Sequence, residues 1–448
     1  MEARISIIGA GSAVFSLGLV RDLCLTPALG GSVVSLMDID PDRLDAIHRL
    51  CVRYIEEAGA DIRAEKTADR QESLRGADFV VNTALIGGHE RMYAGWRQAE
   101  RLGYRIGGSL HVMHDEPFWV NFYQMRFFED VIQDMRELCP SAWYVQVANP
   151  VLAGMTYLGR KYPDVKMVGV CHGFAAVYQL AEQLGLSADE LTYEIPGVNH
   201  NVWLRSIFHR GQDVWPLLDR WIEEEAENFW ASCPYSDDLG PQAVDLYRRF
   251  GVFPIGDTCT PGGGSWPWWY HTDAETEARW REDPVGWWKR YEDHSQNKIR
   301  SIDQAANDPS RPVMDVFPPE KSREVMVPFI EAVATDQPRV LIGNILNTGQ
   351  LVPGIPDDFA VEVPLHVSKR GVRGIQTGAL PPAVIAQITR DRVAPVEIEL
   401  AAYEEGSRER LVELVMTDPW TRSLDQAEEL VSTILAMPEH AAMQAHYQ

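Results

Sequence analysis

Residues 4–14 are Arg-Ile-Ser-Ile-Ile-Gly-Ala-Gly-Ser-Ala-Val, and this stretch decides the fold. Its first five residues are mostly apolar, which predicts a buried parallel strand. The strand leads directly into Gly9, which permits a tight turn, and Gly11, which lets the backbone approach a pyrophosphate. A helix is expected from about Ser16 to Leu25. The pattern predicts a dinucleotide-binding turn, although Val14 stands where such turns usually carry a third glycine.

An acidic residue follows the second expected strand, Val33 to Met37. Asp38 is placed to accept hydrogen bonds from both ribose hydroxyls, and its charge repels a 2′-phosphate, so NAD is favoured over NADP. Ser12, inside the glycine turn, is assigned to the same cofactor. The alternative is that Asp38 only closes a turn. Asp40 is expected instead to cap a helix of about 18 residues that begins at Pro41.

Further apolar segments alternate with helices along the first part of the chain. Strands are expected at residues 78–84, 143–147 and 166–170. This alternation predicts an α/β fold with a Rossmann-like, doubly wound parallel sheet. Thr83 and Asn149 end two of these strands, where such sheets meet their ligand, and both are assigned to the cofactor. Either residue could equally be only a turn residue.

The pattern changes near residue 195. Trp-rich segments, charged helices and Gly/Pro clusters replace the regular alternation, while residues 360–376 alternate as strands do and helices are expected from about residue 381. We therefore predict two domains. Residues 1–195 would hold NAD, and residues 196–448 would contribute to the substrate and metal site and to oligomer contacts.

Composition excludes several classes of partner. The chain has 448 residues and a net charge of −24. Nucleic acid and anionic membrane surfaces both need a basic face, so neither is expected as a partner. No run approaches the roughly 18 apolar residues of a membrane span, and the first strand begins without an export signal. The six cysteines are therefore expected as reduced thiols in a cytoplasmic protein.

Two residues with affinity for soft metal ions follow the expected sheet. Cys171 comes directly after the strand at 166–170, so its side chain is expected at the cofactor cleft. His200 ends the segment Gly197-Val198-Asn199-His200. Taken alone, each is more often structural, Cys171 as a buried inert thiol and His200 as a core histidine. Sulfur and imidazole ligands by themselves favour zinc over manganese.

Six motifs occur in a characteristic order along the chain. They are Gly9-Ala10-Gly11-Ser12, Asp38-Ile39-Asp40, Ala148-Asn149-Pro150, Cys171-His172-Gly173, Gly197-Val198-Asn199-His200 and Pro254-Ile255-Gly256-Asp257-Thr258. In this combination, which covers nearly the whole chain, the sequence resembles glycoside hydrolase family 4, the NAD- and divalent-metal-dependent glycosidases. The resemblance implies Mn²⁺ held by Cys171, His200 and two substrate oxygens. It also implies a second α+β domain similar to the C-terminal domain of lactate and malate dehydrogenases.

The resemblance further implies an oxidative route, an exception to hydrolysis by two carboxylates. NAD⁺ takes hydride from C3 of the sugar, C2 is deprotonated beside the metal, the C1–O bond is eliminated, water adds, and hydride returns. Asp257 is the predicted C2 base. The acid is His172, which can donate near neutral pH, or Asp115, which would equally well cap a helix expected over residues 116–137. The residues expected to contact the substrate are Asn149, His111 and Asn199.

Two departures from the family pattern concern the substrate. The Cys-His-Gly triplet resembles the uronic-acid branch, and Thr260 stands where the glucosidase branch would carry arginine. Together they predict an α-galacturonidase, with α-glucuronidase, α-glucosidase and α-galactosidase as alternatives. A C6 carboxylate would need a basic partner, for which Arg91 and Arg105 are candidates. The segment from Trp266 to Tyr270 would either wall the sugar site or pack at a subunit interface.

Two other functional classes remain open from the sequence. A conventional NAD-dependent 2-hydroxy-acid dehydrogenase needs a His–Asp relay and a substrate-binding arginine, but no Cys–His metal pair. A non-catalytic NAD-sensing regulator would bind the cofactor without turnover and would tolerate loss of Cys171. A homodimer or homotetramer is expected for the glycosidase.

Overall fold

The structure is a computed structural model, and it describes residues 2–11, 15–107, 110–233, 237–263 and 267–448. Its strands are β1 Arg4–Ile8, β2 Val33–Met37, β3 Arg63–Thr67, β4 Phe79–Asn82, β5 Trp143–Gln146, β6 Lys166–Gly169, β7 Leu191–Glu194, β8 Gly197–Val198, β9 Asn201–Leu204, β10 Ser206–His209, β11 Gln212–Asp213, β12 Phe253–Ile255, β13 Arg339–Leu346, β14 Ala360–Ser368 and β15 Gly371–Gly374.

The α-helices are α1 Ser16–Cys24, α2 Pro41–Ala58, α3 Arg70–Leu74, α4 Gly88–Arg101, α5 Phe118–Leu138, α6 Val151–Lys161, α7 Ala176–Gln183, α8 Trp215–Glu224, α9 Ala226–Ser232, α10 Pro241–Phe250, α11 Ala274–Trp280, α12 Pro284–Asn307, α13 Val313–Val316, α14 Met326–Thr335, α15 Pro382–Ile388, α16 Ala394–Glu405, α17 Arg408–Met416, α18 Leu424–Leu435 and α19 Ala441–His446. Short 3₁₀ turns near the site are η2 Gly173–Ala175, η4 Gly256–Thr258 and η5 Pro261–Gly263.

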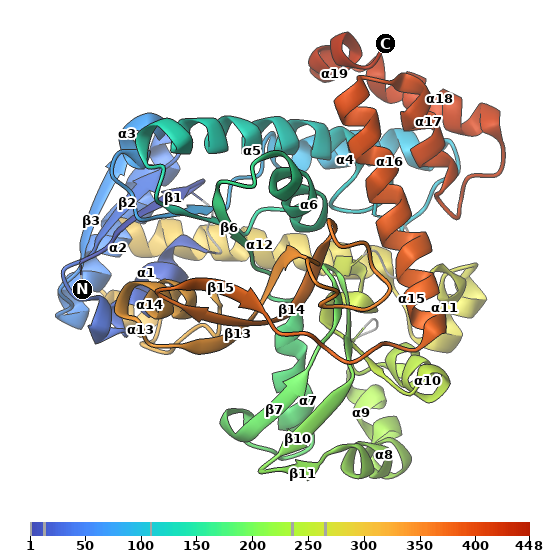
Figure 1. Cartoon of the computed structure of the whole chain (residues 1–448), viewed down its shortest axis with the longest axis horizontal. Helices are drawn as coiled ribbons and strands as arrows, with labels where there is room; N and C mark the ends of the chain where they lie inside the picture. Colours follow the sequence, from blue (N-terminus) through green and yellow to red (C-terminus); the bar gives the residue numbers. More distant parts are fainter. Residues whose placement is uncertain (1, 12–14, 108–109, 234–236, 264–266) are drawn as a thin grey trace.

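The N-terminal strands form a parallel sheet in the order β3-β2-β1-β4-β5-β6. The chain leaves β1 toward β2 and later returns to β4 on its other side, so the strand order reverses at β1. In sheets of this kind ligands bind outside the carboxyl ends of the strands at such a reversal. The predicted Rossmann-like, doubly wound sheet is confirmed, with helices on both of its faces (Figure 1).

The same sheet continues into the C-terminal half of the chain. β13 lies antiparallel to β6, with Asn344 opposite Gly169, and the order then runs through β14, β8, β9 and β12. The strands expected within residues 360–376 are confirmed as β14 and β15. This extension brings β8, which precedes His200, close to the end of β6, which precedes Cys171.

Local sequence signals explain the most accurately predicted elements. Pro41 begins α2, and the Asp40 side chain accepts hydrogen bonds from the backbone amides of Asp42 and Arg43, as predicted. β3 was not predicted, because its residues Arg-Ala-Glu-Lys-Thr are polar and partly exposed at the edge of the sheet. The helices expected after residue 381 are confirmed as α15 to α19.

Of the two roles left open for Asp115, that of a helix cap is wrong. The aromatic helix expected over residues 116–137 is α5, but it begins at Phe118 and its N-cap is Pro117, with no capping side chain. The carboxylate of Asp115 instead lies 2.6 Å from Nδ1 of His114 and accepts a hydrogen bond from Asn149. Pro117, whose ring fixes its φ, occupies the N-cap position, so the Asp115 side chain does not cap the helix and contacts other elements instead.

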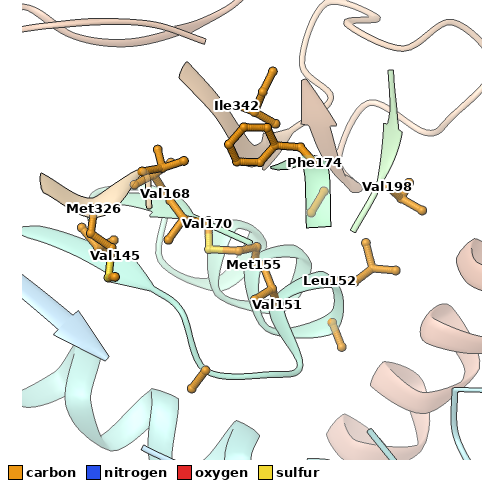
Figure 2. Close-up of a cluster of buried hydrophobic side chains, with 14 of the residues drawn as sticks. Val145, Val151, Leu152, Met155, Val168, Val170, Phe174, Val198, Met326 and Ile342 are labelled. Atoms are coloured by element: carbon orange, nitrogen blue, oxygen red, sulfur yellow. The ribbon is translucent and has the colours of Figure 1, made fainter. Parts of the chain in front are cut away.

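A hydrophobic cluster joins the parallel sheet to its antiparallel extension (Figure 2). Its side chains come from β5, α6, β6, η2, β8, α14 and β13, and they include Val145, Val151, Leu152, Met155, Val168, Val170, Phe174, Val198, Met326 and Ile342. Burial of one such side chain stabilises the fold by about 2 kcal/mol. The loop that carries Cys171 therefore begins on a rigid, well-packed base.

Helix α12 spans a large part of the molecule. Its C-terminal end is held to α2, where Arg53 donates to the carbonyl oxygen of Ala305. Its N-terminal part reaches the region of α11, on the other side of the molecule (Figure 1). In the described residues, neither this helix nor any other has the length and apolar character that crossing a membrane requires.

Candidate active site

The glycine turn after β1 is shaped by close packing. Gly9 has φ +85°, and a Cβ atom there would lie 2.6 Å from Cα of Ala84. The amide of Gly11 donates to Oδ2 of Asp38 at 2.7 Å, and the Asp40 amide donates to Oδ1 of Asp38 at 2.9 Å. Asp38 therefore stands at the end of β2 beside the turn, in the place expected for a ribose-binding acid. Ser12 lies outside the described residues.

The two predicted residues at the ends of β4 and β5 lie in different surroundings. The hydroxyl of Thr83 donates to the carbonyl oxygens of Ile8 and Gly9, so it holds the end of β1 in place. The Asn149 amide donates to Asp115 at 2.9 Å, and its side chain lines a cavity of about 810 Å³. Of these two residues, the structure places Asn149 in that cavity.

This cavity, which we call the central cavity, lies at the carboxyl ends of the sheet strands. Its wall includes Val147 and Val170, which follow β5 and β6, and Leu19 of α1. Part of α12 forms another wall. A cavity at this edge of a doubly wound sheet is the expected place for a cofactor and its substrate.

Three donor side chains converge at the central cavity. Cys171, His200 and Asp257 each offer one atom within 4.8 Å of the others. Sγ of Cys171 lies 3.9 Å from Oδ2 of Asp257, and Nε2 of His200 lies 3.6 Å from the same oxygen. Sulfur, imidazole and carboxylate together form a donor set suited to a divalent transition metal ion. The residues present therefore fit a divalent metal ion, as the sequence resemblance implies.

The backbone around these donors is tightly constrained. Gly256 has φ +53°, and a Cβ atom there would collide with the carbonyl oxygen of Gly173. Only glycine lets the Asp257 loop approach the Cys171 loop so closely. His200 itself adopts φ +59°, a conformation that costs a non-glycine residue free energy and that persists only when its surroundings hold it. The conformations of Gly256 and His200 thus serve to bring the side chains of Asp257, Cys171 and His200 close to one another.

Burial sets the protonation of the sulfur donor. Burial raises the pKa of the Cys171 thiol well above its usual value, and the charges of Glu362 and Asp257 raise it further. The thiol therefore stays protonated until a cation replaces its proton. Asn199 donates to Glu362 at 2.9 Å and Asn344 donates to the same oxygen at 3.1 Å, so this carboxylate ties β8 and β13 together behind Cys171.

A second buried carboxylate supports the histidine. Nδ1 of His200 lies 3.4 Å from Oε1 of Glu116, while Nε2 faces Asp257. Burial lowers the pKa of His200, which favours the neutral imidazole that a metal ligand needs. Burial also raises the pKa of Glu116 well above its usual range, with the charges of Asp115 and Glu399 adding to the effect. A carboxyl group behind a histidine ligand fixes the orientation of its ring.

The two predicted acids differ in their protonation. Burial alone would raise the pKa of Asp115, but His114, His200 and Asn149 outweigh it and lower that pKa, so Asp115 stays ionised. The hydrogen bond to Glu324, at 3.0 Å, raises the pKa of His172, so its imidazolium persists to higher pH. His172 lines the central cavity and is the better proton donor of the two.

Several predicted residues lie away from the central cavity. His111 is buried, with Nδ1 3.3 Å from Glu399. Asn199 does not line the cavity itself, but its buried side chain is hydrogen-bonded to Cys171 and Glu362. Arg91 lies over the ring of Tyr123, and Arg105 pairs with Glu277.

The predicted aromatic segment also lies elsewhere. Tyr270 is buried, and its hydroxyl donates to Asp245. Trp268 lies edge-on to Trp420, with the ring centroids 6.3 Å apart. Trp266 lies outside the described residues. Aromatic side chains of α12 and α7 line the cavity instead.

Sequence reasoning missed three acids of the site. Burial raises the pKa of Asp238, which lines the cavity, to about 7, and Asp257 and Asp237 contribute. Glu116 and Glu362 are almost completely buried. Glu362 alone left a signal, because it is a charged residue inside a strand that is otherwise nearly all apolar, and such a residue must find partners.

A dinucleotide turn and a soft-metal donor set at one edge of a Rossmann-like sheet define a dehydrogenase-like protein with a metal-assisted site. The chain belongs to the family 4 glycosyl hydrolases. The model of that family matches residues 4–186, and the model of the family 4 glycosyl hydrolase C-terminal domain matches residues 195–421. The family named from the sequence motifs is confirmed, and the chain is a glycosidase.

Individual relatives are distant but cover nearly the whole chain. An alpha-galactosidase of Bacillus subtilis (strain 168) is 25% identical over 96% of this chain and 96% of its own length. An alpha-galacturonidase of Lachnoclostridium phytofermentans is 23% identical over 97% of this chain and 95% of its own.

Solved structures confirm the fold. A 6-phospho-alpha-glucosidase from gut microorganisms, in complex with NAD and Mn²⁺, superposes with a TM-score of 0.79 at 17% identity, covering 100% of this chain and 99% of that one. A lactate dehydrogenase from Eimeria maxima superposes with a TM-score of 0.53 at 13% identity, covering 90% and 97%. The predicted likeness to the dehydrogenases is therefore confirmed at the level of fold.

Proposed function

We propose that this chain hydrolyses α-glycosides with NAD⁺ and a divalent metal ion, Mn²⁺ in the family pattern. The observation that carries the proposal is the convergence of Cys171, His200 and Asp257 on a cavity at the strand ends of a dinucleotide-binding sheet. When bound, NAD⁺ and the metal ion would supply transient oxidation at C3 and stabilisation of the charge that develops when C2 loses its proton.

The protein's own residues have distinct proposed roles. Gly9, Gly11 and Asp38 hold the dinucleotide, and Cys171 and His200 hold the metal ion. Asp257 removes the C2 proton, because its carboxylate lies at the metal donors and also faces the cavity.

The leaving group at C1 needs a proton, and His172 is the proposed donor. Its ring lines the central cavity, and Glu324 stabilises its protonated form. Asp115 is better suited to hold Asn149 and His114 as an anion. The chain is proposed to divide into a cofactor domain and a second domain near residue 195, a division that the limits of the two family matches support.

The proposed substrate is an α-galacturonide. Relatives named alpha-galacturonidase support this choice, although a relative named alpha-galactosidase is as similar. Lys298 and Arg323 line the central cavity, and Lys298 lies close enough to His172 to act on it electrostatically. These cations replace Arg91 and Arg105 as the candidates that would receive a C6 carboxylate.

Hydrolysis is expected to require NAD⁺ while producing no net NADH, because the hydride taken from C3 returns before the product leaves. The test is an assay of p-nitrophenyl α- and β-glycosides and uronides with NAD⁺ and Mn²⁺ under reducing conditions, with absorbance read at the nicotinamide and nitrophenol bands. NADH that accumulates in proportion to substrate would instead identify an ordinary dehydrogenase. Cofactor binding without any turnover would identify a regulator.

An α-galacturonide is expected to be cleaved roughly 30- to 150-fold faster, in kcat/KM, than the matching neutral galactoside, since a charge-assisted pair contributes about 2–3 kcal/mol. In Lys298→Gln most of this preference should disappear, while the neutral substrate is cleaved as before. Lys289→Gln, an exposed position on the same helix that does not line the cavity, is the control. Equal wild-type rates on both substrates would refute the uronide assignment and leave the oxidative route intact.

A further inference from the structure

Helix α12 presents aromatic rings to the central cavity. Trp287, Trp288 and Tyr291 all line it. Trp287 and Tyr291 lie one turn apart on the same helix face, and their rings are stacked, with centroids 5.4 Å apart and planes inclined by 6°. Tyr291 is 41% exposed, so this pair reaches the cavity mouth.

The neighbouring tryptophan has a different environment. Trp288 is buried, and its ring lies edge-on to Trp96 at 5.3 Å and to His114 at 6.0 Å. These contacts explain Trp288 as part of the packing between α12 and the N-terminal half. The Trp287 and Tyr291 rings lie edge-on to Trp288, with centroids 5.1 and 5.6 Å away, so the pair is packed on one side. It also lines the cavity and stays partly exposed, which leaves it accessible to a ligand bound there.

The aromatic pair begins beside the proposed base. A Cβ atom added to Gly262 would lie 2.8 Å from Oδ1 of Asp257 and 3.3 Å from the Trp287 ring. The position beside Gly262 therefore lies between the Asp257 carboxylate and the Trp287 indole. From there the pair continues one turn along α12 to Tyr291, which is 41% exposed.

We propose that Trp287 and Tyr291 form a platform for the leaving group of the substrate, and that this leaving group is a second pyranose ring. This inference rests on the proposed glycosidase function. The sugar that reacts must turn its O2 and O3 toward Cys171 and His200, so a group that extends from C1 to the cavity mouth is the leaving group. The C–H faces of a pyranose pack against aromatic rings much as apolar groups do.

The platform predicts a substrate-dependent defect. In Trp287→Ala, kcat/KM for an α-linked digalacturonide should fall about 10-fold, mainly through KM, while that for methyl α-galacturonide stays nearly unchanged. Tyr291→Ala should show a smaller defect of the same kind, and Trp287→Phe should restore much of the loss. Trp215→Ala is the matched control, because Trp215 stacks on Tyr247 in α8 and α10, away from the cavity.

Equal losses on the disaccharide and the methyl glycoside in Trp287→Ala would overturn the platform. If the wild-type protein cleaves neither uronide, the same pair is tested with melibiose and methyl α-galactoside. If no glycoside is cleaved, the proposed function fails, and calorimetric titration with digalacturonide then tests the platform by itself. Weaker binding to Trp287→Ala than to the wild type would support it, and unchanged binding would overturn it.

Discussion

Replacement of Cys171 by serine, or of His200 by alanine, is expected to reduce turnover by on the order of 10³-fold or more while NAD⁺ affinity stays nearly unchanged. The two effects separate because different segments carry the two sites. Cys171 and His200 follow β6 and β8, whereas the turn with Gly9 and Gly11 follows β1 and is held by Asp38 after β2. Loss of one donor therefore weakens the metal site without disturbing the dinucleotide turn.

Measurement of three quantities on each variant tests this expectation. They are kcat on the best glycoside, Mn²⁺ affinity by calorimetry, and NAD⁺ affinity by fluorescence titration. Cys139→Ser is the thiol control, because Cys139 is the C-cap residue of α5 and does not line the central cavity. Thiol oxidation should inactivate the wild type as well, since the sulfur ligand is lost. If chelator-treated Cys171→Ser kept full activity, the assignment of the metal site would be wrong.

The part of the fold that the sequence predicted accurately is the part with local signals. The apolar segment before Gly9 and the Asp40–Pro41 cap each act within a few residues, and both appear as predicted. β3 gave no such signal, because an edge strand can be polar. The antiparallel extension depends on pairing between β6 and β13, whose facing residues Gly169 and Asn344 are far apart in sequence. No local pattern specifies that contact.

The active-site residues likewise divide into those marked by local sequence motifs and those placed by long-range contacts. Cys171, His200 and Asp257 stand in motifs, and the structure brings them together. Glu116 and Glu362 act through contacts with residues on other elements. The segment from Trp266 to Tyr270 was expected either to wall the sugar site or to pack at a subunit interface. Its described residues do not line the cavity, whereas long-range packing places α12 there.

Asp115 shows how tertiary structure decides between two local interpretations. A carboxylate before Glu-Pro and an aromatic helix is a reasonable N-cap by its position alone. In the folded chain Pro117 takes that position, and His114 and Asn149 hold Asp115 at the cavity wall. The same contacts keep it ionised, so the choice of His172 as proton donor follows from surroundings that spacing does not reveal.

Asp257→Asn is expected to lower the rate of hydrolysis by about 10²- to 10⁴-fold, the usual contribution of a positioned general base. Asparagine keeps the shape of the side chain but cannot accept the C2 proton. In D₂O the wild-type product should carry deuterium at C2, because solvent exchanges with the proton that Asp257 has removed. The variant should lose this exchange together with hydrolysis, as measured by proton NMR of the released sugar.

Deuterium exchange at C2 distinguishes loss of the base from loss of another part of the site. The Asp257 carboxylate also lies at the metal donors, so Mn²⁺ affinity must be measured on Asp257→Asn and activity compared at saturating metal. Asp238→Asn is the comparison variant, since Asp238 is another acid of the cavity wall and the charge of Asp257 raises its pKa. Exchange that survives in Asp257→Asn but disappears in Asp238→Asn, or in Tyr291→Phe, would move the base role to that residue. Loss of hydrolysis with exchange intact would place Asp257 in the later steps, after C2 has already been deprotonated.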